Sequence, residues 1–83
     1  MTSSAVNMVA LVEHLAKALV DVPQEVEVEA FEEPGQTVIE LFVAESDLGR
    51  IIGRQGRMAR SLRTIVNSAA LRSRKRYQLE IVE

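Results

Sequence analysis

Apolar residues near the start of the chain recur at the spacing of an α-helix. The stripe begins at Met8 and repeats at i+3, i+4, i+7 and i+11, which places it on one helix face. Its members are Met8, Leu11, Val12, Leu15 and Leu19. Ser3 or Ser4 can cap the first turn, and the residue before Pro23 disfavours helical backbone. The pattern therefore predicts one amphipathic helix that ends before Pro23.

From residue 25 the period changes from helical to alternating. Residues 25–31 alternate between apolar residues and glutamates, which predicts a half-buried strand whose acidic face protects a sheet edge from pairing with other chains. Its apolar face holds Val26, Val28 and Ala30. Residues 37–43 alternate in the same way, with one face made of Thr37, Ile39, Leu41 and Val43. Pro34-Gly35 between the two strands favours a turn, since proline fixes φ and glycine accepts positive φ, so a β-hairpin is expected.

The second half of the chain returns to the helical period, with one interruption. A short helix is expected to begin at Ser46-Asp47, and Gly53-Arg54-Gln55-Gly56 interrupts the pattern. A longer helix resumes near Arg57, with an apolar stripe of Met58, Leu62, Ile65, Val66 and Ala69. A last strand alternates through Tyr77, Leu79 and Ile81.

The resulting order of elements is α-β-β-α-α-β. It predicts an α+β domain in two layers, with a three-stranded mixed sheet and three helices packed on one face. Two helices separate the second strand from the last, which allows these strands to lie parallel as neighbours. We expect a single domain over residues 1–83, with its core over about residues 5–83.

Charge is distributed very unevenly along a chain whose net charge is only −2. Residues 1–49 hold ten acidic side chains and one basic side chain, whereas residues 50–76 hold nine basic side chains and no acidic one. This asymmetry favours an anion-binding face on an acidic body. The alternative is that a basic helix pairs with acidic strands inside the same fold, and charge alone leaves both interpretations open.

Composition excludes several classes of site. The chain has no cysteine, so disulfides, thiolate zinc sites and cysteine nucleophiles are excluded. The single histidine, His14, argues against a histidine-rich metal site or a Ser-His-Asp enzyme. A nucleotide-phosphate enzyme is disfavoured, because no Gly-x-x-x-x-Gly-Lys-Ser/Thr loop occurs and residues 48–76 hold no carboxylate for a metal. No apolar run approaches the roughly 18 residues of a membrane span, so we expect a cytosolic protein. Because the motifs above are absent, we also expect it to be non-enzymatic and without a cofactor.

The interruption at residues 53–56 carries the clearest chemistry. Two glycines let the backbone approach a ligand closely, and the start of the following helix offers free N–H groups to an anion. Arg57 and Arg60 lie in the first turns of that helix, where cations oppose the helix dipole. A bound phosphate would resolve this conflict, since it can meet the helix end and the arginines together.

The motif Ile51-Ile52-Gly53-x-x-Gly56 resembles the signature of the KH domain, an RNA-binding module. The N-terminal helix and hairpin ahead of it are similar to the bacterial, type II form of that fold. Residues 11–20 and 49–57 further resemble the small single-KH proteins of the KhpA (YlqC-like) family. The resemblance covers roughly residues 8–83, and it implies a type II KH fold.

The resemblance implies that the Gly53–Gly56 loop clamps the backbone of about four single-stranded nucleotides. Arg54 and Gln55 would meet phosphates, while Ile51 and Ile52, with residues of the central strand, would floor the groove for bases. The candidate RNA-binding residues are Arg50, Ile51, Ile52, Gly53, Arg54, Gln55, Gly56, Arg57 and Arg60. Arg63 fits an RNA contact or a solvated position equally well. The basic run of Arg72, Arg74, Lys75 and Arg76 favours a solvated helix end over an RNA contact.

The family resemblance also implies a biological setting. It implies an RNA chaperone that acts with a second KH protein, KhpB, in post-transcriptional control linked to cell elongation and envelope growth, including the cell wall. One clamp of about four nucleotides binds weakly, so a homodimer or a heterodimer with that second protein is expected to supply another RNA-binding surface. The alternative function is a protein-interaction adaptor that keeps the KH fold and binds RNA only secondarily.

Overall fold

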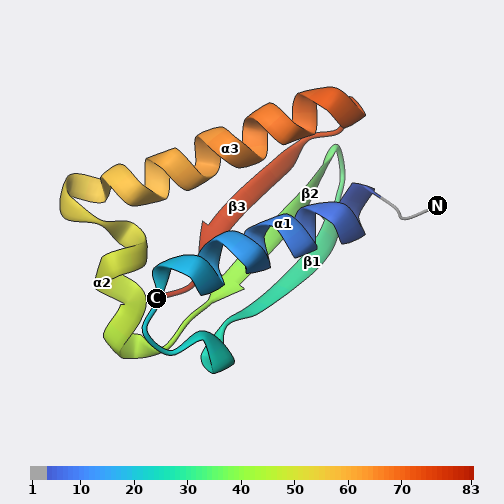
Figure 1. The fold of residues 1–83 in the computed structure, drawn as a ribbon. Helices are drawn as coiled ribbons and strands as arrows, with labels where there is room; N and C mark the ends of the chain where they lie inside the picture. The colour runs from blue at the N-terminus through green and yellow to red at the C-terminus, as the bar shows by residue number, and fades with distance from the viewer. Residues whose placement is uncertain (1–3) are drawn as a thin grey trace.

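The computed structural model describes residues 4–83, with side chains from Asn7 onward. The helices and strands follow the expected order, and two short 3₁₀ turns lie between them (Figure 1). The elements are α1 (Ser4–Leu19), η1 (Pro23–Glu25), β1 (Glu27–Glu33), β2 (Gln36–Phe42), α2 (Glu45–Ile52), η2 (Arg54–Gly56), α3 (Arg57–Ser73) and β3 (Tyr77–Ile81). The expected cap at Ser3 or Ser4 lies outside the described side chains.

The three strands form one mixed sheet with β2 in the centre. β1 and β2 are antiparallel, with Glu33 opposite Gln36 across the Pro34-Gly35 turn, where Gly35 has a φ of 83°. β3 runs parallel to β2, with Thr37 opposite Tyr77. The fold class, the hairpin and the parallel crossover predicted from the sequence are therefore confirmed.

The core lies between one face of the sheet and the helices. α1 and α3 cover that face, and α2 packs against both of them at one end of the domain (Figure 1). The core side chains are Met8, Val12, Ala16, Val26, Ile39, Leu41, Ile51, Leu62, Val66, Ala70, Tyr77 and Leu79. Within residues 4–83, no helix combines the length and apolar content needed to cross a bilayer.

Three details differ from the sequence prediction. The first strand begins at Glu27 and extends to Glu33, and its Ala30 is exposed. Of the expected apolar face, Val26 is buried and Val28 is half-buried. The strand is therefore mostly exposed, whereas we expected a half-buried one. Ile65 is 40% exposed although it follows the apolar stripe of α3, because it lies at the margin of the buried face.

Asp47 is a buried carboxylate that the sequence assigned to the start of a helix. α2 instead begins at Glu45 after Ala44, and Asp47 is only 1% exposed. Its two carboxylate oxygens accept hydrogen bonds from the backbone N–H groups of Asp21 and Val22, both at 3.0 Å. Asp47 therefore satisfies two donors that follow α1 and holds α2 against that segment, which positions the glycine loop at the end of α2.

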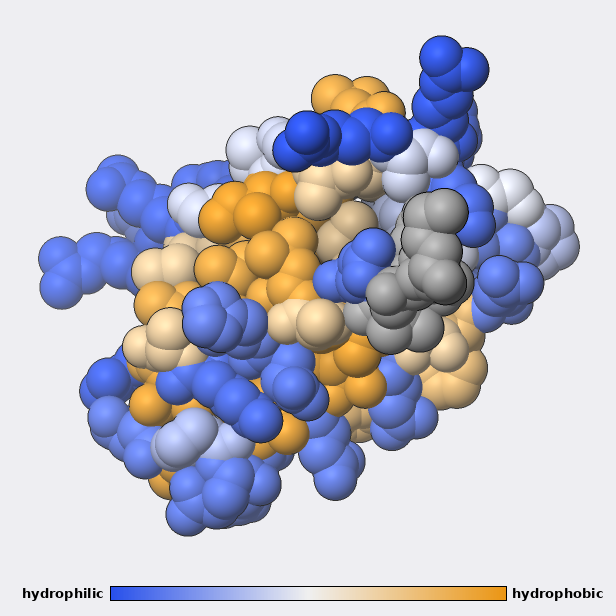
Figure 2. Space-filling model, turned by 45° about the vertical axis from the view of Figure 1, so that its right-hand side comes forward, coloured by the Kyte–Doolittle hydropathy of each residue, from blue (hydrophilic) through white to orange (hydrophobic). Residues whose placement is uncertain are grey.

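The two faces of the sheet differ in character. On the face away from the helices, the register places glutamates of all three strands side by side, as Glu29, Glu40 and Glu80. On the helical side, apolar side chains gather in the middle of the surface and hydrophilic ones surround them (Figure 2). The outer sheet face is therefore acidic, and polyanions are repelled from it.

Candidate nucleic-acid interface

The glycine loop joins α2 to α3 through backbone conformations that side chains rarely adopt. α2 ends where the N–H of Gly53 donates to the carbonyl of Gly49 at 2.8 Å. Gly53 has φ 78° and ψ 171°, a region essentially restricted to glycine. A Cβ at this position would lie 2.7 Å from the Cβ of Met58 and 2.8 Å from its backbone nitrogen. Gly53 therefore permits both the turn and the close approach of the loop to α3.

The remainder of the loop is a tight turn that uses some of its own donors. The N–H of Gly56 donates to the Gly53 carbonyl at 3.1 Å, and the N–H of Arg57 donates to the Arg54 carbonyl. Gly56 is left-handed with φ 72°, and no side chain caps the start of α3. The amides of Gly53, Gly56 and Arg57 are thus already paired, so an anion here would meet the arginine side chains and the other amides of the first turn of α3.

The loop projects a polar pair into solvent. Arg54 and Gln55 are both exposed, and Gln55 adopts a left-handed backbone with φ 57° although it is not a glycine. The Arg57 guanidinium donates to Oε1 of Gln55 at 3.5 Å, a hydrogen bond longer than the usual range that brings the two exposed side chains together. Backbone strain of this kind is often retained at functional sites.

Arg57 and Arg60 share one side of α3. Both are exposed, and with Ser61 and Thr64 they line a shallow hollow on the outer side of the helix. Arg54, Gln55, Arg57 and Arg60 thus form one continuous basic surface, which we call the loop surface. The structure brings together these four residues of the predicted set.

The other predicted residues lie apart from this surface or beneath it. Arg50 forms a two-pronged contact with the Asp21 carboxylate, at 3.2 Å and 3.1 Å. Ile51 is fully buried in the core, so it offers no surface to a ligand and instead anchors the end of α2. Ile52 is half-buried beside the loop. Arg50 would have to exchange its partner to bind a phosphate.

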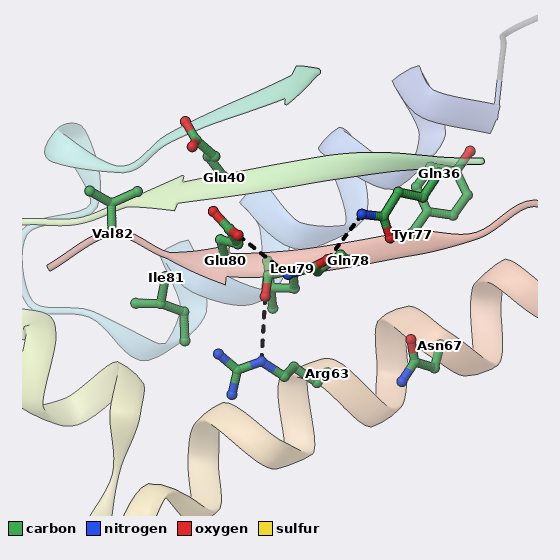
Figure 3. Close-up of a pocket in the computed structure, with 10 residues that line it drawn as sticks. All are labelled: Gln36, Glu40, Arg63, Asn67, Tyr77, Gln78, Leu79, Glu80, Ile81 and Val82. Atoms are coloured by element: carbon green, nitrogen blue, oxygen red, sulfur yellow. Dashed lines mark hydrogen bonds between the residues drawn. The ribbon is translucent and has the colours of Figure 1, made fainter. Parts of the chain in front are cut away.

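A groove lies beside β3, and Gln36 and Glu40 of β2, the central strand that we expected to form its floor, also line it. It has a volume of about 800 Å³, and the rest of its lining comes from residues 77–82, which include the carboxylate of Glu80, and from two side chains of α3. These two, Arg63 and Asn67, point from α3 toward β3 (Figure 3). Nε of Arg63 donates to the Leu79 carbonyl at 3.4 Å, at the edge of β3 that no strand covers. The groove therefore combines a strand edge with polar side chains.

Asn67 was not among the residues considered from the sequence, and Arg63 was left open between an RNA contact and a solvated position. The spacing of Arg57, Arg60 and Arg63 at every third position could have indicated a shared side of the helix. Nothing in the sequence indicates that β3 runs close enough for Arg63 to reach the Leu79 carbonyl. Arg63 lies about 9 Å along α3 from Arg57, so the groove begins near the loop surface.

Ion pairing inside the fold does not neutralise this basic side. Among the described side chains, the ion pairs within 4.0 Å are Lys17–Glu13 and Arg50–Asp21. None joins an arginine of α3 to a glutamate of the sheet, so the described contacts give no support to the alternative in which a basic helix pairs with acidic strands. The positive charge of α3 remains available to an external anion.

Comparison with known proteins finds bacterial relatives that are named RNA-binding proteins. The family model for the KhpA/KhpB KH domain matches residues 9–81. The chain is 43% identical to the RNA-binding protein KhpA of Borreliella burgdorferi, over 93% of this chain and 94% of that protein. It is 49% identical to the protein of the same name from Caldanaerobacter subterraneus subsp. tengcongensis, over 87% of this chain and 96% of that protein. The Aquifex aeolicus protein of that name is 47% identical, over 88% of this chain and 92% of that protein.

A solved structure shares the fold at low sequence identity. It is Era in complex with MgGDPNP and nucleotides 1506–1542 of 16S ribosomal RNA, with a TM-score of 0.67 and 22% identity. The match covers 96% of this chain and 30% of the Era chain. At this identity the similarity concerns the fold alone.

Proposed function

The chain belongs to the KhpA/KhpB KH-domain family, and from that membership we propose that it binds single-stranded RNA by clamping the RNA backbone at the Gly53–Gly56 loop. The observation that carries the proposal is the exposed Arg54-Gln55 pair, held between two glycines at the uncapped start of α3. Relatives over nearly the whole chain are named RNA-binding proteins, which supports RNA as the ligand. The role that we propose is binding and not catalysis.

Phosphates and bases would meet different parts of this site. The loop surface supplies guanidinium groups that match phosphate oxygens, and the Arg57 guanidinium lies beside the Gln55 side chain of the loop. Bases extending from the clamped backbone would enter the groove beside β3, where Leu79 and Ile81 lie on an uncovered strand edge. Single-stranded bases can be read there through their hydrogen-bonding edges. Ile52 would pack against the first of them.

The site predicts a preference for single strands and a moderate dependence on salt. About three to four phosphate contacts give a log–log slope of affinity against salt of roughly −2 to −3. A duplex of the same sequence is expected to bind at least tenfold more weakly, because side chains cannot enter the deep groove of A-form RNA. Fluorescence anisotropy with a short labelled strand and its duplex measures both quantities.

Two results would contradict this proposal. Equal affinity for the single strand and the duplex would exclude the clamp, and so would an affinity that does not change with salt. A chain that binds neither RNA but still associates with another protein would favour the adaptor function instead.

The proposal extends to the setting in which the site works. One clamp of about four nucleotides is weak, and a second RNA-binding surface on another chain raises avidity by about 10²–10⁴. We therefore propose a homodimer or a heterodimer with a second, KhpB-like KH protein. Light scattering and co-purification distinguish these two forms. From the family resemblance we further propose a cytoplasmic RNA chaperone in post-transcriptional control linked to cell elongation, cell shape and cell-wall growth.

A further inference from the structure

The turn between α3 and β3 holds a second group of basic side chains, far from the glycine loop. Arg74, Lys75 and Arg76 are consecutive and exposed, and they line a cleft of about 480 Å³ against the tip of the β1–β2 hairpin. The Arg76 carbonyl accepts a hydrogen bond from the N–H of Thr37 at 2.9 Å. This bond fixes the turn to the sheet, so the three cations have a defined place.

These cations are not neutralised within the described part of the chain. Glu32 and Glu33 line the opposite wall of the cleft, yet neither carboxylate lies within 4.0 Å of Arg74, Lys75 or Arg76. Glu33 instead accepts a hydrogen bond from the Gln36 amide at 3.2 Å. The turn therefore keeps three positive charges free to meet an external anion.

Arg74 also occupies a position where helices usually place glycine. It ends α3 in the left-handed conformation, with φ 59° and ψ 26°. Glycine adopts this conformation without strain, whereas a side chain there is disfavoured. A basic side chain retained at a strained position points to a role other than stability.

The position of this cluster relates it to the loop surface. α3 spans 17 residues from Arg57 to Ser73, so the glycine loop and the turn lie about 25 Å apart along one helix. The groove with Arg63 and Asn67 lies between them, and Gln36 lines both that groove and the cleft. A polar path, which the carboxylates of Glu40 and Glu80 also line, therefore joins the groove to the cleft, and Arg63 and Asn67 form its α3 side.

We propose that Arg74, Lys75 and Arg76 form a second phosphate-binding site for the same RNA strand, a site that rests on the proposed function of the glycine loop. Phosphates of a stacked strand rise about 3.4 Å per nucleotide, so four nucleotides cover about 14 Å and cannot reach the turn. A strand of about eight nucleotides reaches it. One chain then covers about twice the length that the glycine loop clamps alone.

The test compares strands of four and eight nucleotides on two proteins. An eight-nucleotide strand offers five registers to a four-nucleotide site, so about a fivefold gain in affinity needs no second site. We expect the wild-type protein to bind the longer oligouridine about 50-fold more tightly in low salt. The variant Arg74→Gly/Lys75→Gln is expected to keep the four-nucleotide affinity and to gain only about fivefold with length. For the longer strand, the log–log slope of the variant's affinity against salt concentration should be smaller in magnitude by about 1.4 than that of the wild type.

Two controls separate this site from its alternatives. Lys17→Glu on α1 changes the net charge by the same two units, and it is expected to preserve the 50-fold gain. Arg74→Gly alone should raise Tm by about 2–6 °C, which shows that any loss of affinity is not a loss of folding.

The outcomes distinguish the two proposals. An equal length gain in the wild type and the double variant would overturn the second site and leave the loop proposal standing. An equal loss for both strand lengths in the variant and in the Lys17→Glu control would assign the effect to net charge and would also overturn it. A wild-type protein that binds neither strand would overturn the loop proposal and this inference with it.

Discussion

Replacing Arg54 and Gln55 together by aspartate is expected to weaken single-stranded RNA binding by about 100-fold and to leave the fold unchanged. The two side chains are exposed at the tip of the loop, so neither contributes to the core. The substitution replaces a phosphate-binding cation by two anions at the point where we propose that the RNA backbone lies. Aspartate also tolerates the left-handed backbone of residue 55, so no new strain is introduced.

Anisotropy measures the affinity in this experiment, and circular dichroism and thermal melting measure the fold. The matched control is His14→Glu/Lys17→Glu on α1, which lowers the net charge by the same three units at exposed positions. It is expected to weaken binding by no more than about threefold through long-range repulsion. A loop variant that binds as tightly as the wild type would show that the loop is not the clamp.

The two glycines of the loop are expected to differ strongly in their tolerance of a side chain. Gly53→Ala should destabilise the fold by about 3–5 kcal/mol, because it adds backbone strain and a clash with Met58. Gly56→Ala should cost only about 1–2 kcal/mol, because the position is left-handed but no atom lies within 4 Å of the added Cβ. The first glycine is required by both packing and backbone conformation, and the second by backbone conformation alone.

Thermal melting of the two variants tests this difference. At about 4–8 °C per kcal/mol for a domain of this size, Gly53→Ala should lower Tm by about 15 °C or more, and Gly56→Ala by less than about 15 °C. The two variants carry the same substitution and similar φ values, so each is the control for the other. Equal losses would mean that the approach of Gly53 to Met58 does not contribute to stability.

The features predicted correctly from the sequence are those that depend on local chemistry. The Pro34-Gly35 turn requires only the preferences of two adjacent residues, and the presence of a strand on either side of it requires only a period of two. The burial that this period predicted for β1 was wrong. The break between α2 and α3 is likewise marked by its own glycines. These preferences act within a few residues, so they do not depend on contacts with the remainder of the chain.

The features that were missed depend on contacts between distant segments. Asp47 meets the backbone of Asp21 and Val22, which are 26 and 25 residues away, and no local pattern indicates such partners. Ile65 belongs to an apolar stripe that is wider than the surface its neighbours cover, so periodicity alone could not identify the exposed margin. Residues of an amphipathic helix are assigned to core or surface only once the adjoining elements are in place.

The candidate site shows the same division. Gly53, Arg54, Gln55 and Gly56 could be chosen from the motif because the loop is a local structure. Arg63 could not be chosen in this way, since its contact with the Leu79 carbonyl depends on how α3 crosses the sheet. The motif thus located the loop that we propose as the clamp, whereas the groove that we propose for bases required the tertiary fold.

Amide chemical-shift mapping by NMR tests the central claim most directly, because it locates the RNA on the folded protein. Titration with an unlabelled single-stranded octanucleotide is predicted to shift the amides of residues 52–60 first, together with those of Arg63, Leu79 and Ile81 beside the groove. The amides of β1 on the acidic outer sheet should stay unchanged. Shifts confined to β1, with the glycine loop unaffected, would contradict the proposal that this loop clamps RNA.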